Sequence, residues 1–214
     1  MVYTIGKLFI PPLYNLWVRD IYGLKNIPRD IPFIIAANHS SYYETLLPYT
    51  ILIPILNKQI HALVNNRYWD NIITKIIIEW SKSIPVFVGK DYDANKNNES
   101  IEKATIYLKK GDLIQIFPEG TRSFDGILKK GHNGVAKLAL KAKVPVVPMG
   151  IIGSCKILPK GKIFPRFTRC DVKFGKPISF EKYYNKKINN KTLDDVTRQI
   201  MKKIAKLICQ EYNY

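Results

Sequence analysis

Short runs of hydrophobic residues alternate along this chain with longer segments in which hydrophobic residues recur every three to four positions. A continuous apolar run at residues 33–37 indicates a strand that is buried on both faces. Residues 113–117 predict a second buried strand, and residues 145–152 a further strand. Residues 84–88 and 171–175 predict two more strands. Helical spacing predicts helices over residues 68–81, 99–110, 134–143 and 192–212, and a helix that starts from Ser41. Because strands alternate with helices, we expect an α/β fold with a mostly parallel central sheet flanked by helices.

Two further segments can be assigned from the sequence, one of them polar and the other at the N-terminus. Residues 91–100 are polar and rich in asparagine, and they predict a loop. Residues 1–30 are expected to form an N-terminal amphipathic helical appendage, and residues 31–214 the main domain. Within the appendage, residues 3–18 have helical spacing with a kink at Pro11-Pro12, and this helix either lies at a lipid interface or packs on the main domain.

Targeting segments are not evident in this pattern. No apolar run reaches the roughly 18 residues of a membrane-spanning helix. The N-terminal residues lack the early basic region and the small-residue cleavage site of a secretory signal peptide. The three cysteines, Cys155, Cys170 and Cys209, have no metal-binding spacing, so we expect no metal site, and a reducing compartment fits.

The charge balance is strongly basic, with 34 Lys and Arg residues against 17 Asp and Glu residues and a net charge of +17. Such a charge favours an acidic partner, either nucleic acid or an anionic membrane surface. A genome that favours lysine throughout would also produce part of it. No zinc-finger, RNA-recognition or basic-helix signature accompanies the charge, so we expect a membrane surface and no nucleic acid.

A histidine and a glutamate follow the first buried run. His39 is expected at the carboxyl end of a strand, where ligand sites in open α/β sheets gather, and Glu44 follows five residues later. An imidazole can take a proton from an alcohol near neutral pH, and a carboxylate on its other nitrogen can orient it. However, Ser41-x-x-Glu44 is also a capping box, and the local sequence alone favours that simpler explanation.

A second motif, Phe117-Pro118-Glu119-Gly120-Thr121-Arg122-Ser123, follows the second buried run. Gly120 permits a tight turn, and Arg122 can hold a phosphate through two parallel hydrogen bonds. The hydroxyls of Thr121 and Ser123 can donate further hydrogen bonds. Taken alone, the motif is more often an ordinary turn with a solvated arginine.

In this order and separation, the two motifs resemble those of the glycerolipid acyltransferases typified by 1-acylglycerol-3-phosphate O-acyltransferase. That family has a His, four residues and an Asp, followed by a Phe-Pro-Glu-Gly-Thr-Arg-Ser block that this sequence matches at all seven positions. The resemblance covers residues 24–176. Residues 129–134 and 144–150 are similar to later family blocks, which makes residues 31–214 the expected acyltransferase domain.

Two positions depart from the family pattern. Glu44 stands where the family usually has Asp, which keeps the acid and adds a methylene. Residues 84–90 lack the Arg that contacts substrate phosphate in the family, and Lys90 is the nearest cation. Lysine is a point charge rather than a planar fork, so this departure leaves the identity of the acceptor more open than the reaction type.

The resemblance implies an enzyme that transfers a fatty acyl group from acyl-CoA or acyl carrier protein to the free hydroxyl of 1-acylglycerol 3-phosphate. The product would be phosphatidic acid, an intermediate of phospholipid synthesis. His39 would take the hydroxyl proton, and Glu44 would orient His39. The glycerol phosphate part of the acceptor would be bound by Glu119, Gly120, Thr121 and Arg122, with help from Lys90. His61 and His132 are expected to be structural or surface residues.

The resemblance also implies partners and a location. No cofactor is expected beyond the acyl donor, and the lysophospholipid acceptor places the protein on the cytoplasmic face of a membrane, peripheral or interfacially anchored. One alternative is an acyltransferase that acts on glycerol 3-phosphate or another lysolipid. The other is a non-catalytic peripheral membrane-binding protein.

Overall fold

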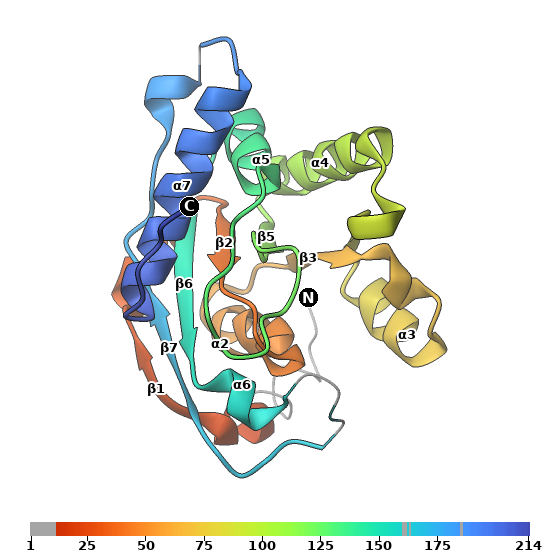
Figure 1. Cartoon of the computed structure of the whole chain (residues 1–214), viewed down its shortest axis with the longest axis vertical. Helices are drawn as coiled ribbons and strands as arrows, with labels where there is room; N and C mark the ends of the chain where they lie inside the picture. Colours follow the sequence, from red (N-terminus) through yellow and green to blue (C-terminus); the bar gives the residue numbers. More distant parts are fainter. Residues whose placement is uncertain (1–11, 160–161, 163, 185) are drawn as a thin grey trace.

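The computed structural model describes residues 12–159, 162, 164–184 and 186–214. Within these residues, a seven-stranded sheet forms the centre of the molecule, in the order β1-β7-β6-β2-β5-β3-β4. Helices cover both of its faces (Figure 1). The strands are β1 (Val18–Tyr22), β2 (Ile34–Ala37), β3 (Ile60–Asn65), β4 (Ile84–Val86), β5 (Leu113–Ile116), β6 (Val146–Ile152) and β7 (Cys170–Phe174).

The sheet is mostly parallel, which confirms the predicted fold class. β6, β2, β5, β3 and β4 run parallel to one another, whereas β7 is antiparallel to β6 and pairs in parallel with β1. Every residue of β2 and β5 is buried. The apolar run of β2 and the apolar residues on either side of Gln115 in β5 predicted this, because strands covered by helices on both faces need mostly apolar side chains on both sides.

The helices pack in two layers. The α-helices are α2 (Leu47–Leu56), α3 (Ile72–Trp80), α4 (Ala94–Lys109), α5 (Gly134–Ala142), α6 (Ser154–Ile157) and α7 (Asn190–Leu207). The 3-10 helices are η1 (Asn15–Trp17), η2 (Leu24–Asn26), η3 (Tyr42–Leu46), η4 (Asn66–Trp69), η5 (Gly89–Asp91) and η6 (Glu181–Tyr183). Side chains alternate across a strand, so Ile34 and Ala36 of β2 join the apolar cluster of α4, α5 and α7. Ile35 and Ala37 join the cluster that contains α2.

Two regions differ from the sequence-based expectation. β3 was not predicted, because the polar His61 interrupts its apolar run. The segment 91–100 was expected to be a loop, but α4 begins at Ala94. Asp93 caps this helix by accepting the N–H groups of Asn95 and Lys96, and this cap outweighs the low helix propensity of the asparagines.

The N-terminal segment is described only from residue 12. The predicted helix of residues 3–18 therefore lies mostly outside the described residues, although residues 12–14 are helical. Val18–Tyr22, within the segment predicted to be helical, instead form β1 and pair with β7. The division of the chain at residue 30 stays a prediction. Among the helices that the structure describes, none is long and apolar enough to cross a membrane.

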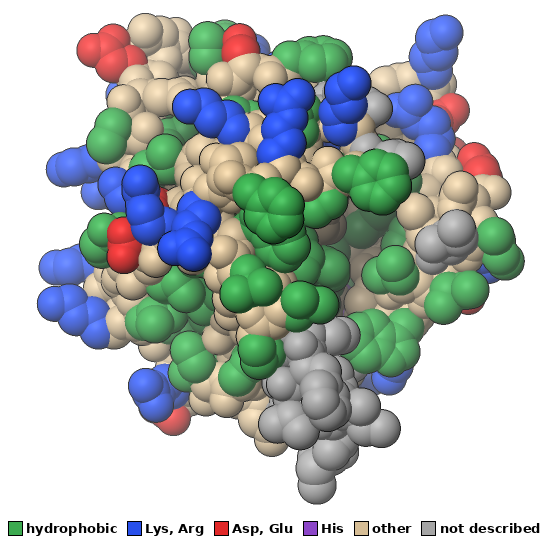
Figure 2. Space-filling model, turned by 90° about the horizontal axis from the view of Figure 1, so that it is seen from below, with side chains coloured by type: hydrophobic (Ala, Val, Ile, Leu, Met, Phe, Trp, Pro, Cys, Tyr) green, Lys and Arg blue, Asp and Glu red, His purple; other side chains and the backbone are tan. Residues whose placement is uncertain are grey.

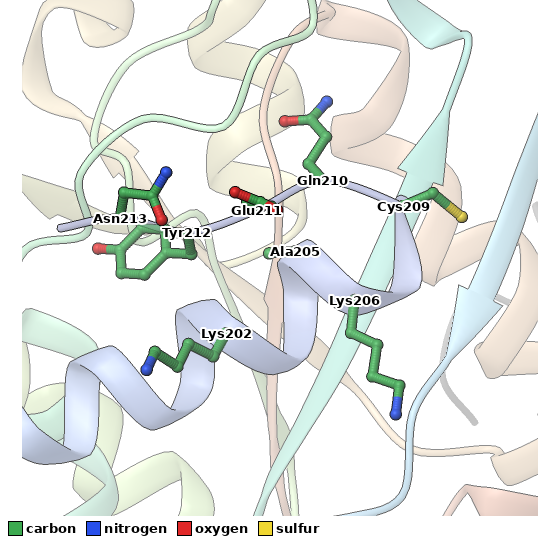
Figure 3. Close-up of a pocket in the computed structure, with 8 residues that line it drawn as sticks. All are labelled: Lys202, Ala205, Lys206, Cys209, Gln210, Glu211, Tyr212 and Asn213. Atoms are coloured by element: carbon green, nitrogen blue, oxygen red, sulfur yellow. The ribbon is translucent and has the colours of Figure 1, made fainter.

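The C-terminal residues turn back along α7 (Figure 3), so this helix ends at Leu207 rather than at the predicted residue 212. The Gln210 side chain accepts the N–H of Leu128 at 2.8 Å and donates to the carbonyl of Gly126 at 2.9 Å. The hydroxyl of Tyr212 accepts the N–H of Gly131 at 3.0 Å. The tail thus holds the loop that follows the second sequence motif.

Candidate active site

The two sequence motifs meet at one edge of the sheet. His39 follows β2 and Phe117 follows β5, and these strands are parallel neighbours, so their carboxyl ends lie side by side. The Phe117 ring stacks on the His39 imidazole, with centroids 3.9 Å apart and planes inclined by 15°. The N–H of Ser123 donates to the His39 carbonyl at 2.8 Å. Tertiary structure therefore joins both motifs into one site.

The Glu44 carboxylate points at the His39 ring rather than back at Ser41. Nδ1 of His39 lies 2.8 Å from Oε2 of Glu44. The Ser41 hydroxyl does cap η3, since it accepts the N–H of Tyr43 at 3.2 Å. Glu44 accepts the N–H of Ser40 instead, at 2.7 Å. The Glu44 carboxylate is thus placed to fix the tautomer and orientation of the His39 imidazole.

Two serine hydroxyls complete the surroundings of Glu44, which is 0% exposed. The Ser40 hydroxyl donates to Oε1 at 2.6 Å, and the Ser154 hydroxyl at the start of α6 donates to the same oxygen. A buried carboxylate is costly unless hydrogen bonds satisfy it, and these donors do so. Sequence reasoning missed Ser154, because it is 110 positions from Glu44 and no local motif marks it.

The end of β2 is also fixed to β6. The Asn38 side chain donates to the carbonyl of Ile151 at 2.9 Å and accepts its N–H at 2.7 Å. These two bonds extend the β2–β6 pairing by one residue through a side chain. Asn38 therefore holds the backbone from which His39 projects.

Glu119 was expected to contact the substrate, but both of its carboxylate oxygens bind backbone groups of the protein. Oε1 accepts the N–H of His39 at 2.7 Å, and Oε2 accepts the N–H of Lys129 at 2.8 Å. The residue is 2% exposed. Burial raises the pKa of Glu119 to about 7, although the N–H groups of Lys129 and His39 act in the opposite direction. This geometry gives Glu119 a positioning role.

The raised pKa of Glu119 predicts a pH-dependent stability. The folded protein binds this proton more tightly than the unfolded chain, whose ordinary value is 4.5. The contribution of this proton to the free energy of unfolding is therefore fully present below pH 4.5, and it is lost as the pH rises through about 7. We expect urea unfolding of the wild type to lose on the order of 3 kcal/mol relative to Glu119→Gln between those limits. Free energies of unfolding that change equally with pH in the two proteins would contradict this.

The second motif forms a tight turn beside the histidine. The N–H of Gly120 donates to the carbonyl of Phe117 at 3.0 Å, and Gly120 has φ +64°. A Cβ at this position would lie 3.2 Å from Cδ2 of His132. Both the backbone conformation and the close neighbour therefore favour glycine. Thr121 lines the adjoining cavity.

Arg122 is held in place by a ring contact, and one nitrogen of its guanidinium has no hydrogen-bond partner among the described residues. Its Cζ lies 3.5 Å from the centroid of the Tyr42 ring, and the Tyr42 hydroxyl is 2.9 Å from that of Tyr68. Nη1 of Arg122 is buried and has no hydrogen-bond partner among the described residues. A buried, unpaired N–H of a cation is costly, so this arrangement suits an anionic ligand.

A second arginine lies on the same cavity wall, and sequence reasoning missed it. Arg67 of η4 lines the cavity. Burial raises the pKa of Tyr68 to about 12, and the charges of both Arg122 and Arg67 oppose this rise, which places both cations near Tyr68. Lys90, the cation expected from sequence, is exposed in η5 and does not belong to the cavity wall.

The site opens into a cavity of about 1790 Å³. This exceeds the ~300–1,000 Å³ of ordinary small-molecule pockets. The walls away from His39 are largely apolar and come from α2, β3, α3, β4 and α4, including Ile53, Ala62, Ile77, Ile78, Val86 and Ile101. His39 lines the cavity with a side chain that is 16% exposed. Within the described residues, its Nε2 atom has no hydrogen-bond partner.

The other two histidines fit the structural roles expected of them. His61 is buried in β3 and stacks on Tyr107. Its ring nitrogens lie 3.1 Å from the Lys82 carbonyl and 3.2 Å from the Asp112 carboxylate. His132 contacts the turn of the second motif, since its N–H donates to the Pro118 carbonyl at 2.8 Å.

Comparison with known proteins agrees with this geometry. Residues 18–152, from the start of β1 to the end of β6, match the family model described as Acyltransferase. The chain belongs to the acyltransferase family. This match includes both motifs and therefore His39, Glu44 and Arg122.

Several members of the acyltransferase family are similar to this chain. A chloroplastic 1-acyl-sn-glycerol-3-phosphate acyltransferase of Brassica napus is 32% identical over 160 residues, which covers 73% of this chain and 44% of that protein. A 1-acyl-sn-glycerol-3-phosphate acyltransferase of Bacillus subtilis is 30% identical over 145 residues, covering 67% and 68%. The chain thus spans less than half the length of the plant relative.

A solved structure shows the same acyltransferase fold. The crystal structure of the 1-acyl-sn-glycerophosphate acyltransferase from Thermotoga maritima aligns with a TM-score of 0.68 and 21% identity. The alignment covers 97% of this chain and 80% of that one. The likeness extends beyond the matched residues 18–152 and includes β7 and α7.

Proposed function

We propose that this protein is a 1-acylglycerol-3-phosphate O-acyltransferase, which forms phosphatidic acid from a lysophospholipid and acyl-CoA or acyl carrier protein. The observation that carries the proposal is one cavity that contains an oriented His39–Glu44 pair, an arginine with an unpaired N–H and a large apolar space. These are the three features that a base-catalysed acyl transfer to a phosphate-bearing lipid requires. The names of the relatives support the choice of acceptor.

The proposed reaction is a direct attack on the thioester. Nε2 of His39 takes the proton of the acceptor hydroxyl as its oxygen bonds to the thioester carbonyl carbon. The tetrahedral intermediate then collapses, the carbon–sulfur bond breaks, and the departing thiolate receives the proton from Nε2. Glu44 holds the Nδ1–H and stabilises the imidazolium. No acyl-enzyme is needed, because the hydroxyl itself is the nucleophile.

The acceptor phosphate is proposed to bind Arg122 and the turn that contains Gly120 and Thr121. Nη1 of Arg122 supplies the unpaired donor, and guanidinium–phosphate bonds are among the strongest hydrogen bonds in proteins. Arg67 stands on the same wall and is a better candidate than Lys90 for the missing family arginine. Glu119 contributes by holding the backbone of His39 rather than by contacting phosphate.

Replacement of Arg122 is expected to impair recognition of the phosphate specifically. Loss of charge-assisted hydrogen bonds worth about 1.5–3 kcal/mol corresponds to a roughly 10- to 150-fold lower kcat/KM for lysophosphatidate in Arg122→Ala. Arg122→Lys should recover part of this loss, because it restores the charge without the fork. Steady-state kinetics with monoacylglycerol, which lacks the phosphate, provide the control. An equal loss with both acceptors would contradict the assignment.

The function itself is tested by offering the purified protein a mixed panel of acyl donors and acceptors and identifying the products by mass spectrometry. Phosphatidic acid formed from lysophosphatidate would support the proposal. Acylation of glycerol 3-phosphate or another lysolipid alone would replace the acceptor. Binding to lipid vesicles without any acyl transfer would favour a non-catalytic membrane protein.

We propose that the protein works at the cytoplasmic face of a membrane, as a peripheral or interfacially anchored protein. Both the acceptor and the product of the proposed reaction are lipids. The net charge of +17 favours an anionic lipid surface. Apolar side chains of α3 that line the cavity, among them Ile76 and Trp80, are also exposed, which suits entry of a lipid substrate from a bilayer.

A further inference from the structure

The loop between α6 and β7 presents two large apolar side chains to solvent. Phe164 is 77% exposed and Phe167 is fully exposed. Removal of a phenylalanine side chain from water is favourable in proportion to the apolar area that is buried. The structure thus exposes two adjacent sources of binding energy in one short segment, residues 164–169, which we name the Phe loop.

Hydrogen bonds hold the Phe loop in this shape. The N–H of Arg166 donates to the carbonyl of Ile157 at 2.8 Å, and the indole N–H of Trp17 donates to the carbonyl of Arg166 at 2.9 Å. The N–H of Thr168 donates to the same carbonyl at 2.9 Å. Phe167 therefore lies at the tip of a tight turn that is fastened to α6 and to the N-terminal segment. Its exposure follows from this fixed turn.

Positively charged residues flank the Phe loop in the sequence. Residues 155–170 contain Lys156, Lys160, Lys162, Arg166 and Arg169, and no Asp or Glu. Of these, Lys156, Lys162, Arg166 and Arg169 are exposed. Apolar and aromatic side chains flanked by cations suit the boundary between lipid headgroups and acyl chains. Arginine pairs with lipid phosphate there while the ring enters the apolar layer.

The position of the Phe loop fits the same partner. Helix α6 and the start of β7 lie at the lower end of the molecule in Figure 1, and Figure 2 shows the molecule from that end. Hydrophobic side chains surround a hollow on this face, and Lys and Arg side chains follow one of its margins. Leu13 and Leu16, which precede the Trp17 anchor, are also exposed. A flat anionic surface could contact these apolar and cationic groups together.

We infer that the Phe loop inserts Phe164 and Phe167 into the interface of an anionic bilayer, while Arg166 and Arg169 bind lipid phosphates. This docking would hold the protein at the membrane from which the acceptor of the proposed reaction would come. The inference rests on the proposed function only for this purpose, and it is tested without measuring acyl transfer.

Fluorescence of Phe167→Trp in the full chain gives a direct test. On addition of vesicles of phosphatidylglycerol and phosphatidylcholine, its added emission should shift to shorter wavelength and be quenched by lipids brominated on the acyl chain. The matched control is Ile106→Trp, at an exposed position of α4, which should show neither change. Emission of Phe167→Trp that stays unquenched while the protein sediments with the vesicles would overturn the inference.

Vesicle sedimentation tests the apolar and the cationic parts of the membrane contact separately. The double variant Phe164→Ser/Phe167→Ser should bind roughly tenfold or more weakly, whereas Ile106→Ser should bind as the wild type does. Arg166→Gln/Arg169→Gln should weaken binding to anionic vesicles and not to neutral ones. Unchanged binding by both double variants would refute the docking role. Because neither readout involves catalysis, their outcome is separate from that of the acyltransferase assay.

Discussion

Replacement of His39 by alanine is expected to lower acyl transfer to lysophosphatidate by roughly 10²- to 10⁴-fold, the usual contribution of a positioned general base. The acceptor hydroxyl is a poor nucleophile until its proton leaves. His39 is placed to take it, because Glu44 engages Nδ1 and the imidazole that carries Nε2 lines the cavity. Transfer of a labelled acyl chain by purified protein measures the effect.

The His39→Ala protein should remain folded and should still bind the acceptor. The ring is stacked on Phe117 but lies at the cavity wall, and Glu44 keeps its bonds to Ser40 and Ser154. Thermal unfolding checks the fold, and lysophosphatidate binding checks Arg122. Undiminished turnover by a folded variant would remove His39 from the role of base.

Replacement of Glu44 by glutamine is expected to cost a comparable factor, roughly 10²- to 10⁴-fold in kcat, with little change in KM. The Ser40 N–H can only donate, whereas the hydroxyls of Ser40 and Ser154 can also accept. The amide oxygen should therefore take the position of Oε2 beside Nδ1 of His39, and the imidazole keeps an acceptor. The negative charge that stabilises the imidazolium would be lost.

The kcat and KM measurements distinguish this role from a merely structural one. Glu44→Asp keeps the charge but is shorter by a methylene, so it should withdraw from Ser154 at the start of α6 and show an intermediate kcat. Glu99→Gln removes an exposed carboxylate of α4 and should leave kcat unchanged. An active Glu44→Gln protein, or a loss confined to KM, would show that Glu44 does not orient the base.

Much of the fold could be predicted because the chemistry is local along the chain. β2 is a continuous apolar run, and β5 is apolar except for Gln115. Strands of this composition are typical of sheets that helices cover on both faces. Helical periodicity likewise predicted α5 and the start of α7 within two residues. The pattern failed at β3, where His61 is buried and satisfied by Lys82 and Asp112, groups that a local pattern does not include.

The candidate site could likewise be predicted only in part. The two motifs were expected to follow the carboxyl ends of β2 and β5, and the structure brings them together there. Glu119, Arg67 and Ser154 could not be assigned in advance, because each acts through a partner elsewhere in the chain. Glu119 binds the backbone of His39, which lies 80 positions away, so its role depends on strand order rather than on its own motif.

By itself, the sequence determined five of the seven strands, the order of the two motifs and the chemical groups available for proton transfer and phosphate binding. These depend on residue type and on spacing within a few positions. Only the tertiary structure decided that the Glu44 carboxylate turns to His39 rather than to the first N–H groups of its helix. The sequence allowed both, and the hydroxyls of Ser40 and Ser154 stabilise the carboxylate only where it also reaches the imidazole.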